Sequence, residues 1–295
     1  MRTVLVVNPT KIGLERLRRR VGRRCRALGV EEPQVMRTTP DDPGEGLARE
    51  AVRLGAGLVL SAGGDGTVMA VARGLAHTGV PLGVLPAGTG NLLARNLDLP
   101  LDLPEALEVA LTGRDRRLDL GCATGADGDR RFAVMAGIGF DAAMMADAPG
   151  RLKAALGWPA YVVSGARHLR DRPMTVELRL DDGPPLTRSA RGIIVGNVGT
   201  LQGGLHLLPG ATPSDGLLDV VVLSPQRLRD WAQVVVGLAV RRDGGEHDVE
   251  RFQVRTVRLR TDRPQPSQLD GEAAGDVDEL QVEVDPGALL VRVPR

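Results

Sequence analysis

Short apolar runs alternate with helical patterns along the first part of the chain. Buried strands are predicted at Val4–Val7, Leu58–Leu60 and Leu82–Leu85, and another near Gln34–Arg37. The segments between these runs keep apolar residues at the spacing of a helix that packs one face against a sheet. This order of strands and helices predicts an α/β domain with a doubly wound, mostly parallel sheet.

The pattern changes near residue 120, after a helical segment at Pro104–Leu111. From there most segments alternate apolar and polar residues, as strands with one buried face do. The strand-like segments are Arg117–Leu120, Phe132–Met135, Thr175–Leu180, Gly192–Val195, Leu218–Val222, Thr256–Leu259, Leu280–Val284 and Leu289–Val293. Only Asp141–Arg170 and Pro225–Arg241 look helical. We therefore predict an α/β domain over residues 1–120 and a mostly antiparallel, β-rich domain over 121–295.

A glycine-rich turn, Gly63-Gly64-Asp65-Gly66-Thr67, connects the strand Leu58–Leu60 to a helical segment. Such a turn lets backbone N–H groups and a helix N-terminus converge on an anion with no side chain in the way. It is not a Walker loop, since no lysine follows the last glycine, and its spacing differs from the dinucleotide fingerprint. Taken alone, it could also be a tight turn capped by Asp65 or Thr67.

Polar loops follow each of the four predicted parallel strands. They contain Asn8, Thr39, the Gly63–Thr67 turn and the segment Thr89–Asn91. In a doubly wound sheet, ligands gather outside the carboxyl ends of the strands. The four loops therefore predict one site that binds phosphate.

Charge and composition narrow the class of protein. The chain has 295 residues, of which 42% are hydrophobic, and a net charge of +1. This balance argues against a nucleic-acid-binding protein with a basic surface. Cys25 and Cys122 match no metal spacing and suit a reducing cytosol. The longest apolar run, around Val234–Val240, is too short for a membrane span, so we expect a cytoplasmic protein that is soluble or lies on a membrane surface.

The first predicted helix is rich in arginine, with seven such residues between Arg16 and Arg26. One interpretation is a solvated helix face in an arginine-rich protein. The other is attraction to anionic lipid, worth about 1 kcal/mol for each basic residue near the surface.

Six motifs in this order resemble the diacylglycerol kinase catalytic family, which includes bacterial soluble lipid kinases and the sphingosine kinases. They are Asn8-Pro9, Gly63–Thr67, Leu85–Asn91, Gly137–Asp141, Asp215–Asp219 and Leu269–Glu272. The resemblance covers nearly the whole chain. It implies a bacterial enzyme that uses ATP and Mg²⁺ to phosphorylate a lipid alcohol such as diacylglycerol. It also implies a role in phospholipid biosynthesis and a peripheral association with the membrane surface.

The resemblance also implies roles for single residues. Thr38 competes with Thr39 as a nucleotide contact, and Met69 stands where the family frequently has Asn. The nucleotide-binding residues it implies are Asn8, Pro9, Thr10, Thr39, Gly63, Gly64, Asp65, Gly66, Thr67, Thr89 and Glu272.

A structural Mg²⁺ is implied at Asp215 and the carbonyl groups of Thr212 and Leu217, an all-oxygen set that suits this cation. Asp270 resembles the general base of the family. Since an ordinary aspartate has a pKa near 3.9, it would accept the proton of the alcohol late, as the P–O bond forms. Both Asp215-Gly216 and Asp270-Gly271 could instead be plain hairpin turns.

Two other functions remain open. NAD kinases share the Gly-Gly-Asp-Gly-Thr turn, but their Asn-Glu pair and Thr-Gly-Ser-Thr-Ala segment are absent here. A lipid-binding regulator without catalytic activity would not need the Asp65, Asp215 and Asp270 motifs together. The identity of the lipid and a homodimeric state are left undecided by the sequence.

Overall fold

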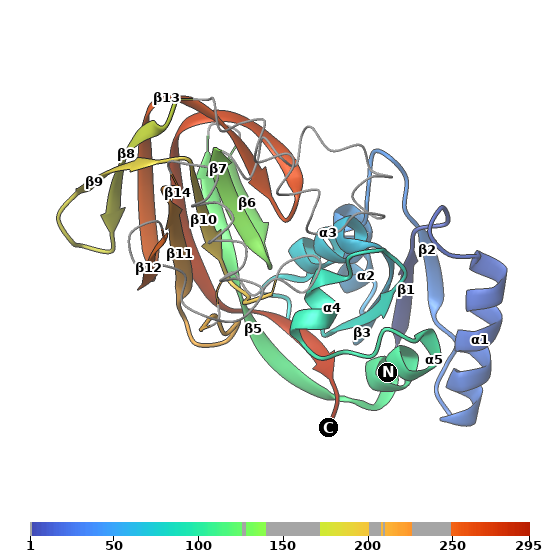
Figure 1. Cartoon of the computed structure of the whole chain (residues 1–295). Coiled ribbons are helices and arrows are strands. Elements are labelled where there is room, and N and C mark those ends of the chain that lie inside the picture. Colours follow the sequence, from blue (N-terminus) through green and yellow to red (C-terminus); the bar gives the residue numbers. More distant parts are fainter. Residues whose placement is uncertain (1, 126–127, 140–171, 201–207, 209, 226–248) are drawn as a thin grey trace. The chain divides into compact units, whose positions relative to one another are not determined.

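The computed structural model describes residues 2–125, 128–139, 172–200, 208, 210–225 and 249–295 (Figure 1). Contacts divide the chain into a first unit, Met1–Leu118 with Pro286–Arg295, and a second unit, Asp119–Asp285. The helical segments predicted at 141–170 and, except for Pro225, at 225–241 lie outside the described residues, as does Phe140-Asp141 of the fourth motif.

The first unit contains a parallel sheet, as predicted. Four of its strands are β1 (Thr3–Val7), β2 (Gln34–Arg37), β3 (Leu58–Gly63) and β4 (Leu82–Pro86). Their order in the sheet is β4-β3-β1-β2, and the neighbours pair in parallel. β1, β3 and β4 are buried along their whole length, which explains why they appear in the sequence as continuous apolar runs.

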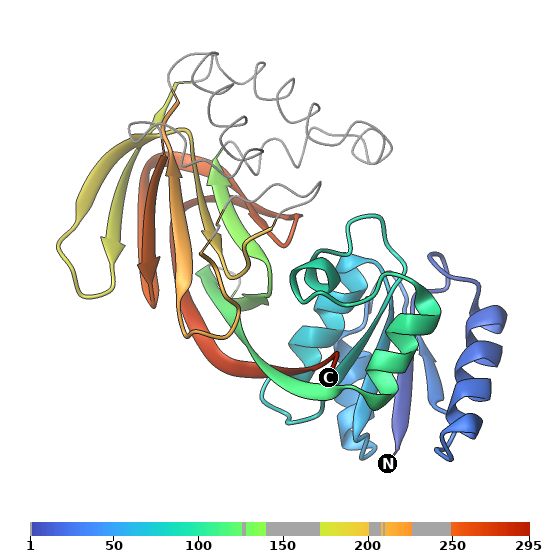
Figure 2. The same cartoon turned by 60° about the horizontal axis from the view of Figure 1, so that its bottom comes forward.

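Helices cover both faces of this sheet (Figure 2). They are α1 (Leu14–Ala27), α2 (Glu45–Arg53), α3 (Asp65–Leu75), α4 (Leu92–Asn96) and α5 (Leu103–Thr112). Leu17 and Val21 of α1 share one core with Leu107 of α5 and with Leu5 and Leu60 of the sheet. α2 packs against α3 on the other face. The doubly wound arrangement is confirmed.

The second unit is built from antiparallel strands, again as predicted. They are β5 (Arg114–Gly125), β6 (Gly128–Phe132), β7 (Met135–Gly139), β8 (Met174–Leu180), β9 (Leu186–Ala190), β10 (Gly192–Gly196), β11 (Leu218–Leu223), β12 (Val249–Val254), β13 (Thr256–Leu269) and β14 (Glu272–Val293). β6, β9 and β12 were not predicted as strands of their own. Ile138, Val176, Val220, Val257 and Val282 belong to the apolar core of this unit.

The end of β14 belongs to the first unit, although the pattern of apolar and polar residues predicts one domain over all of 121–295. Val291 pairs in parallel with Leu82 of β4, and the carbonyl oxygen of Ala288 accepts the N–H of His77 at 2.7 Å. Leu289 and Val291 are fully buried. These long-range contacts have no local signature in the sequence.

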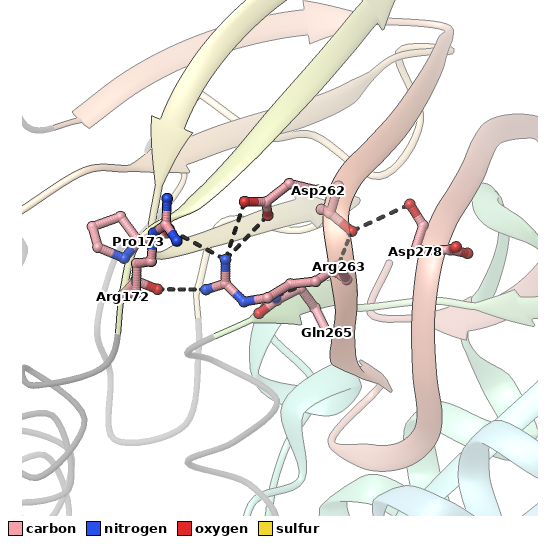
Figure 3. A network of polar contacts seen from close by, with 7 residues as sticks. Arg172, Pro173, Asp262, Arg263, Gln265 and Asp278 are labelled. Atoms are coloured by element: carbon pink, nitrogen blue, oxygen red, sulfur yellow. Dashed lines mark hydrogen bonds and ion pairs between the residues drawn. The ribbon is translucent and has the colours of Figure 1, made fainter.

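β13 carries a large irregularity opposite β14, since the register shifts between Arg260 and Gln265. Arg263 lies in this bulge and contacts the start of β8 (Figure 3). Its guanidinium donates to the carbonyl oxygens of Arg172 at 2.5 Å and Pro173 at 3.5 Å, and to the carboxylate of Asp262 at 3.1 Å. The bulge is therefore stabilised by hydrogen bonds that join β13 to the residues just before β8.

Candidate nucleotide and catalytic sites

The glycine turn after β3 lies against the loop after β4. A Cβ atom on Gly88 would lie 2.7 Å from the Cα atom of Gly64, and one on Gly63 would lie 2.6 Å from the Cβ atom of Thr67. Side chains at these two positions would clash, so glycine is required there. The close approach leaves the backbone of both loops free of side chains at the strand ends, as phosphate binding requires.

Asp65 joins these two loops. Its Oδ2 atom accepts the N–H of Asn91 at 2.9 Å, and its Oδ1 atom accepts the N–H of Leu92 at 2.5 Å. Asn91 is the N-cap residue of α4 and has a φ of 50°. The interpretation of Asp65 as a cap of its own helix, α3, is wrong, because that helix begins without a side-chain cap. Asp65 instead caps α4 and holds the second loop in place.

Asn8 joins the ends of β1 and β3. Its Nδ2 atom donates to Oγ1 of Thr67 at 3.3 Å, and its own N–H donates to the carbonyl oxygen of Ala62 at 2.9 Å. The side-chain oxygen of Asn8 accepts both the N–H and the hydroxyl of Thr10, at 3.0 and 2.7 Å. Asn8, Thr10 and Thr67 therefore form one connected polar group beside the glycine turn.

Thr38 and Thr39 follow β2 and differ in position. The N–H of Thr38 extends the sheet by donating to the carbonyl oxygen of Val7 at 3.0 Å. Thr39 is exposed, and its hydroxyl accepts the N–H of Asp42 at 3.1 Å. Both threonines thus lie at the carboxyl edge of the sheet. The prediction that Thr39 contacts the nucleotide, with Thr38 as the alternative, remains a prediction.

The remaining residues predicted to bind the nucleotide are accessible in the structure. Those of the first unit are Pro9, Gly66 and Thr89, and all three are exposed. Glu272 belongs to the second unit, where it is the first residue of β14 and is also exposed. Their contacts with a nucleotide remain predictions.

Asp270 lies in the two-residue turn between β13 and β14. Leu269 pairs with Glu272, and Asp270 and Gly271 have φ angles of 50° and 84°. Positive φ at both central positions is the signature of a type I′ hairpin turn. The plain-turn interpretation of Asp270-Gly271 is therefore correct for the backbone.

The carboxylate of Asp270 nevertheless has a specific environment. It accepts three backbone N–H groups, from Ala133 at 3.1 Å, Val134 at 2.8 Å and Met135 at 3.1 Å. Ala133 and Val134 lie between β6 and β7, and Met135 is the first residue of β7, whereas the apolar pattern predicted one strand, Phe132–Met135. The strand breaks there because its N–H groups turn to the carboxylate. The Asp270 side chain is thus fixed in one position.

The loop that precedes β11 has the composition predicted for a cation site. Oδ1 of Asp215 accepts the N–H of Leu217 at 3.0 Å, and the carbonyl oxygen of Thr212 accepts the N–H of Ser214 at 2.7 Å. Asp215 is exposed. Among the residues that the structure describes, no group of three or more His, Cys, Asp or Glu side chains is arranged to hold a metal ion.

Asp219 is the second carboxylate near this loop. Burial raises its pKa, a hydrogen bond from Gln253 lowers it, and the negative charge of Asp215 raises it again. Asp215 and the carbonyl groups of Thr212 and Leu217 offer only oxygen donors, the type that Mg²⁺ prefers, and Asp219 is a second carboxylate close to Asp215. The donor types are consistent with the predicted ion.

Two buried residues that join these loops were not predicted from the sequence. Asp119 is 5% exposed, and its Oδ2 atom accepts the N–H of Gly216 at 2.7 Å. Asn197 is 2% exposed, and its Nδ2 atom donates to the carbonyl oxygens of Asp119 at 2.8 Å and Ala133 at 3.1 Å. The loop of Asp215 is thereby connected to the N–H groups that hold Asp270. The local signal for both residues is a polar side chain among apolar neighbours.

In the part of the chain that the structure describes, no helix is long and apolar enough to cross a membrane.

Comparisons with known proteins agree with this geometry. The model of the diacylglycerol kinase catalytic domain matches residues 2–123, and that of the YegS C-terminal NAD kinase beta sandwich-like domain matches residues 133–293. A protein of Chromohalobacter salexigens, named probable lipid kinase YegS-like, is 34% identical over 99% of this chain and 93% of its own length. The diacylglycerol kinase of Mycobacterium tuberculosis is 31% identical over 92% of this chain and 88% of its own.

Solved structures show the same fold at lower identity. A diacylglycerol kinase from Bacillus anthracis has a TM-score of 0.76 at 20% identity, over 99% of this chain and 96% of its own. An NAD kinase from Archaeoglobus fulgidus, solved with ATP, has a TM-score of 0.55 at 16% identity, over 99% of this chain and 93% of its own. By identity and coverage together, the chain belongs to the lipid kinase family that contains the diacylglycerol kinases.

Proposed function

We propose that this protein transfers the γ-phosphoryl group of ATP to the hydroxyl group of a lipid alcohol, with diacylglycerol as the first candidate. The observation that carries the proposal is the environment of Asp270. A turn residue needs no partner for its side chain, yet three backbone N–H groups hold this carboxylate. Such a fixed position is what a proton acceptor in phosphoryl transfer requires.

The reaction divides between two sets of residues. The glycine turn and the loop held by Asp65 bind the phosphate groups through backbone N–H donors. The hydroxyl oxygen of the lipid attacks the γ-phosphorus atom, the bond to the bridging oxygen breaks, and ADP leaves. Asp270 accepts the hydroxyl proton as the new P–O bond forms, because an ordinary carboxylate is too weak a base to remove it earlier.

The residues that would hold Mg²⁺ in this proposal are Asp215 and, through their carbonyl groups, Thr212 and Leu217. Bound there, the ion would offset the repulsion between Asp215 and Asp219 and stabilise the loop that Asp119 holds.

We also propose that the enzyme works from the cytoplasm at a membrane surface, where its acceptor lies. Two arginines of α1 form ion pairs, Arg24 with Glu108 and Arg26 with Glu32. The other five have no ion pair within the described part of the chain: Arg16, Arg18, Arg19, Arg20 and Arg23. A helix face with this much uncompensated positive charge is attracted to anionic lipid.

The test is a panel of lipid alcohols in mixed micelles with labelled ATP, with and without Mg²⁺. NAD⁺ is included as an acceptor, because NAD kinases share the fold. We expect Mg²⁺-dependent phosphorylation of at least one lipid and none of NAD⁺. If NAD⁺ is phosphorylated and no lipid is, the acceptor is NAD⁺ and the proposed lipid acceptor is wrong. If no acceptor is phosphorylated, the result favours a lipid-binding protein without activity.

A further inference from the structure

The second unit carries a polar hollow of about 900 Å³, whose lining includes Leu217 of the loop proposed to hold Mg²⁺. It lies beside the turn that follows β8 and over the neighbouring part of β13 and β14. Three arginines line it: Arg179, Arg255 and Arg258. All three are exposed, so a ligand from solution can reach them.

Two of these arginines lie directly opposite each other. Arg179 of β8 pairs with Arg258 of β13, and Arg258 pairs with Gln281 of β14. Residues directly opposite in an antiparallel pair share a face, and like charges placed so destabilise the sheet. This row therefore costs stability as it stands.

The next row on the same face has the opposite arrangement. Arg260 of β13 lies between Glu177 of β8 and Glu279 of β14. Opposite charges therefore lie directly across from Arg260 in the register, which is the arrangement that cross-strand pairing favours. The two rows lie two residues apart on the same three strands. Since the second row shows that these strands can place a glutamate opposite an arginine, the arginine pair of the first row is not a general property of the strands.

The charges in the hollow do not neutralise one another by contact. Within the described residues, none of the three arginine side chains has a hydrogen bond or an ion pair. Oδ1 of Asp181 accepts the N–H groups of Arg255 and Thr256, at 2.8 and 2.9 Å, so this oxygen is turned toward the backbone.

Two further carboxylates, Asp182 and Glu283, also line the hollow, and in the described part of the chain neither forms an ion pair with the arginines. The lining therefore contains both acidic and basic side chains, and the guanidinium groups are accessible to a ligand. Such a wall suits a ligand that offers phosphate oxygens to the arginines and hydroxyl groups to the carboxylates.

We propose that this hollow binds a phosphate monoester, through the guanidinium groups of Arg179 and Arg258. A phosphate accepts two parallel N–H bonds from one guanidinium, and its charge would remove the repulsion between the two arginines. The monoester could be a soluble compound or the headgroup of a lipid, since both present the same chemistry. The proposal does not depend on the kinase reaction.

The test measures protection of single arginines in the full-length protein. Phenylglyoxal modifies accessible arginines, and peptide mass spectrometry gives the rate for Arg179, Arg258 and the matched control Arg260. One arm adds glycerol 3-phosphate, a second adds vesicles of phosphatidylcholine with phosphatidic acid, and a third adds chloride at equal ionic strength. We expect slower modification of Arg179 and Arg258 in the first or second arm, with Arg260 unchanged.

Protection in the first arm identifies a soluble phosphate monoester, and protection only in the second identifies a lipid headgroup. The variants Arg179→Gln and Arg258→Gln should each require about tenfold more of the effective probe to protect the remaining arginine, whereas Arg260→Gln should not. Equal modification rates in all three arms, or equal protection of Arg260, would overturn the proposal. Phosphorylation of lipids by the same preparation is a separate result and would not change this conclusion.

Discussion

At the scale of single residues, the two aspartates of the glycine turn and the hairpin turn have different roles. Asp65 accepts N–H groups from a neighbouring loop and so positions the backbone that we propose binds phosphate. Asp270 accepts N–H groups as well, but from a broken strand in the second unit. We therefore expect changes at Asp65 to alter nucleotide affinity, and changes at Asp270 to alter turnover.

The Asp270→Asn variant tests the proposed base. Asn tolerates the left-handed conformation of this position and keeps one oxygen for the N–H groups, so the fold should survive. It cannot accept the hydroxyl proton, and turnover should fall by about 100-fold or more. The measurement is a single-turnover assay with the best lipid of the panel, alongside ATP binding, which should barely change.

A matched control is Asp98→Asn, at another aspartate with a positive φ, although Asp98 is exposed and Asp270 is half-buried. It should leave turnover within about twofold, since Asp98 belongs to none of the proposed sites and only surface effects are expected. Near wild-type turnover of Asp270→Asn would reject the mechanism.

The Gly64→Ala variant tests the nucleotide site. The added Cβ atom would lie 3.5 Å from the Cα atom of Gly88, an ordinary contact, so the fold should be retained. The methyl group would occupy space that phosphate needs beside the backbone, and ATP affinity in calorimetry should fall by about tenfold or more, which is about 1.4 kcal/mol. Gly125→Ala, with no atom near its added Cβ, is the control and should bind ATP normally. Unchanged affinity of Gly64→Ala would argue against the assigned site.

At the scale of elements, α1 combines a buried stripe with a basic outer face. Leu17, Val21 and Cys25 are buried against the sheet, while Arg18 and Arg19 are exposed. Replacing Arg18, Arg19 and Arg20 by Gln should weaken sedimentation with anionic vesicles by about 1 kcal/mol for each charge at the surface, and added salt should weaken binding of the wild type.

The control replaces Arg24, which already pairs with Glu108, by Gln. This change should affect vesicle binding less than any of the three. If vesicle binding responds neither to salt nor to the triple replacement, the arginines of α1 form an ordinary solvated helix face and do not bind the membrane.

At the scale of the whole molecule, two strands pass from one unit into the other. β5 crosses the boundary at Leu118, and β14 crosses it at Asp285. The first unit therefore contains the end of the chain and cannot be complete without it. A chain cut after residue 120 would lack Leu289 and Val291, both fully buried in the first unit.

Deletion of residues 286–295 tests this dependence. Each fully buried aliphatic side chain contributes about 1.5–3 kcal/mol, so the first unit should lose most of its stability and ATP binding should disappear. Thermal unfolding and calorimetry measure both effects. Deletion of only Pro294 and Arg295, which are exposed, should leave the melting temperature almost unchanged. A stable, ATP-binding protein after the longer deletion would show that the end of β14 is dispensable.

Features that depend on near neighbours could be predicted from the sequence. Buried parallel strands appear as continuous apolar runs, as Val4–Val7 does, and half-buried strands appear as alternation, as Thr175–Leu180 does. The glycine turn was recognised because close backbone approach requires glycine at fixed positions. The family was recognised because six such local motifs occur in order.

The groups that these motifs contact emerged only from the three-dimensional arrangement of the strands. Asp270 is held by Val134, which is 136 residues away in sequence, and Asn197 joins Asp119 to Ala133 across 78 and 64 residues. Such contacts depend on the pairing of distant strands, and a pattern of apolar and polar residues carries no information about that pairing beyond which face is buried. For the same reason, the cap that Asp65 provides to α4, and the return of β14 to the first sheet, could not be predicted from local sequence.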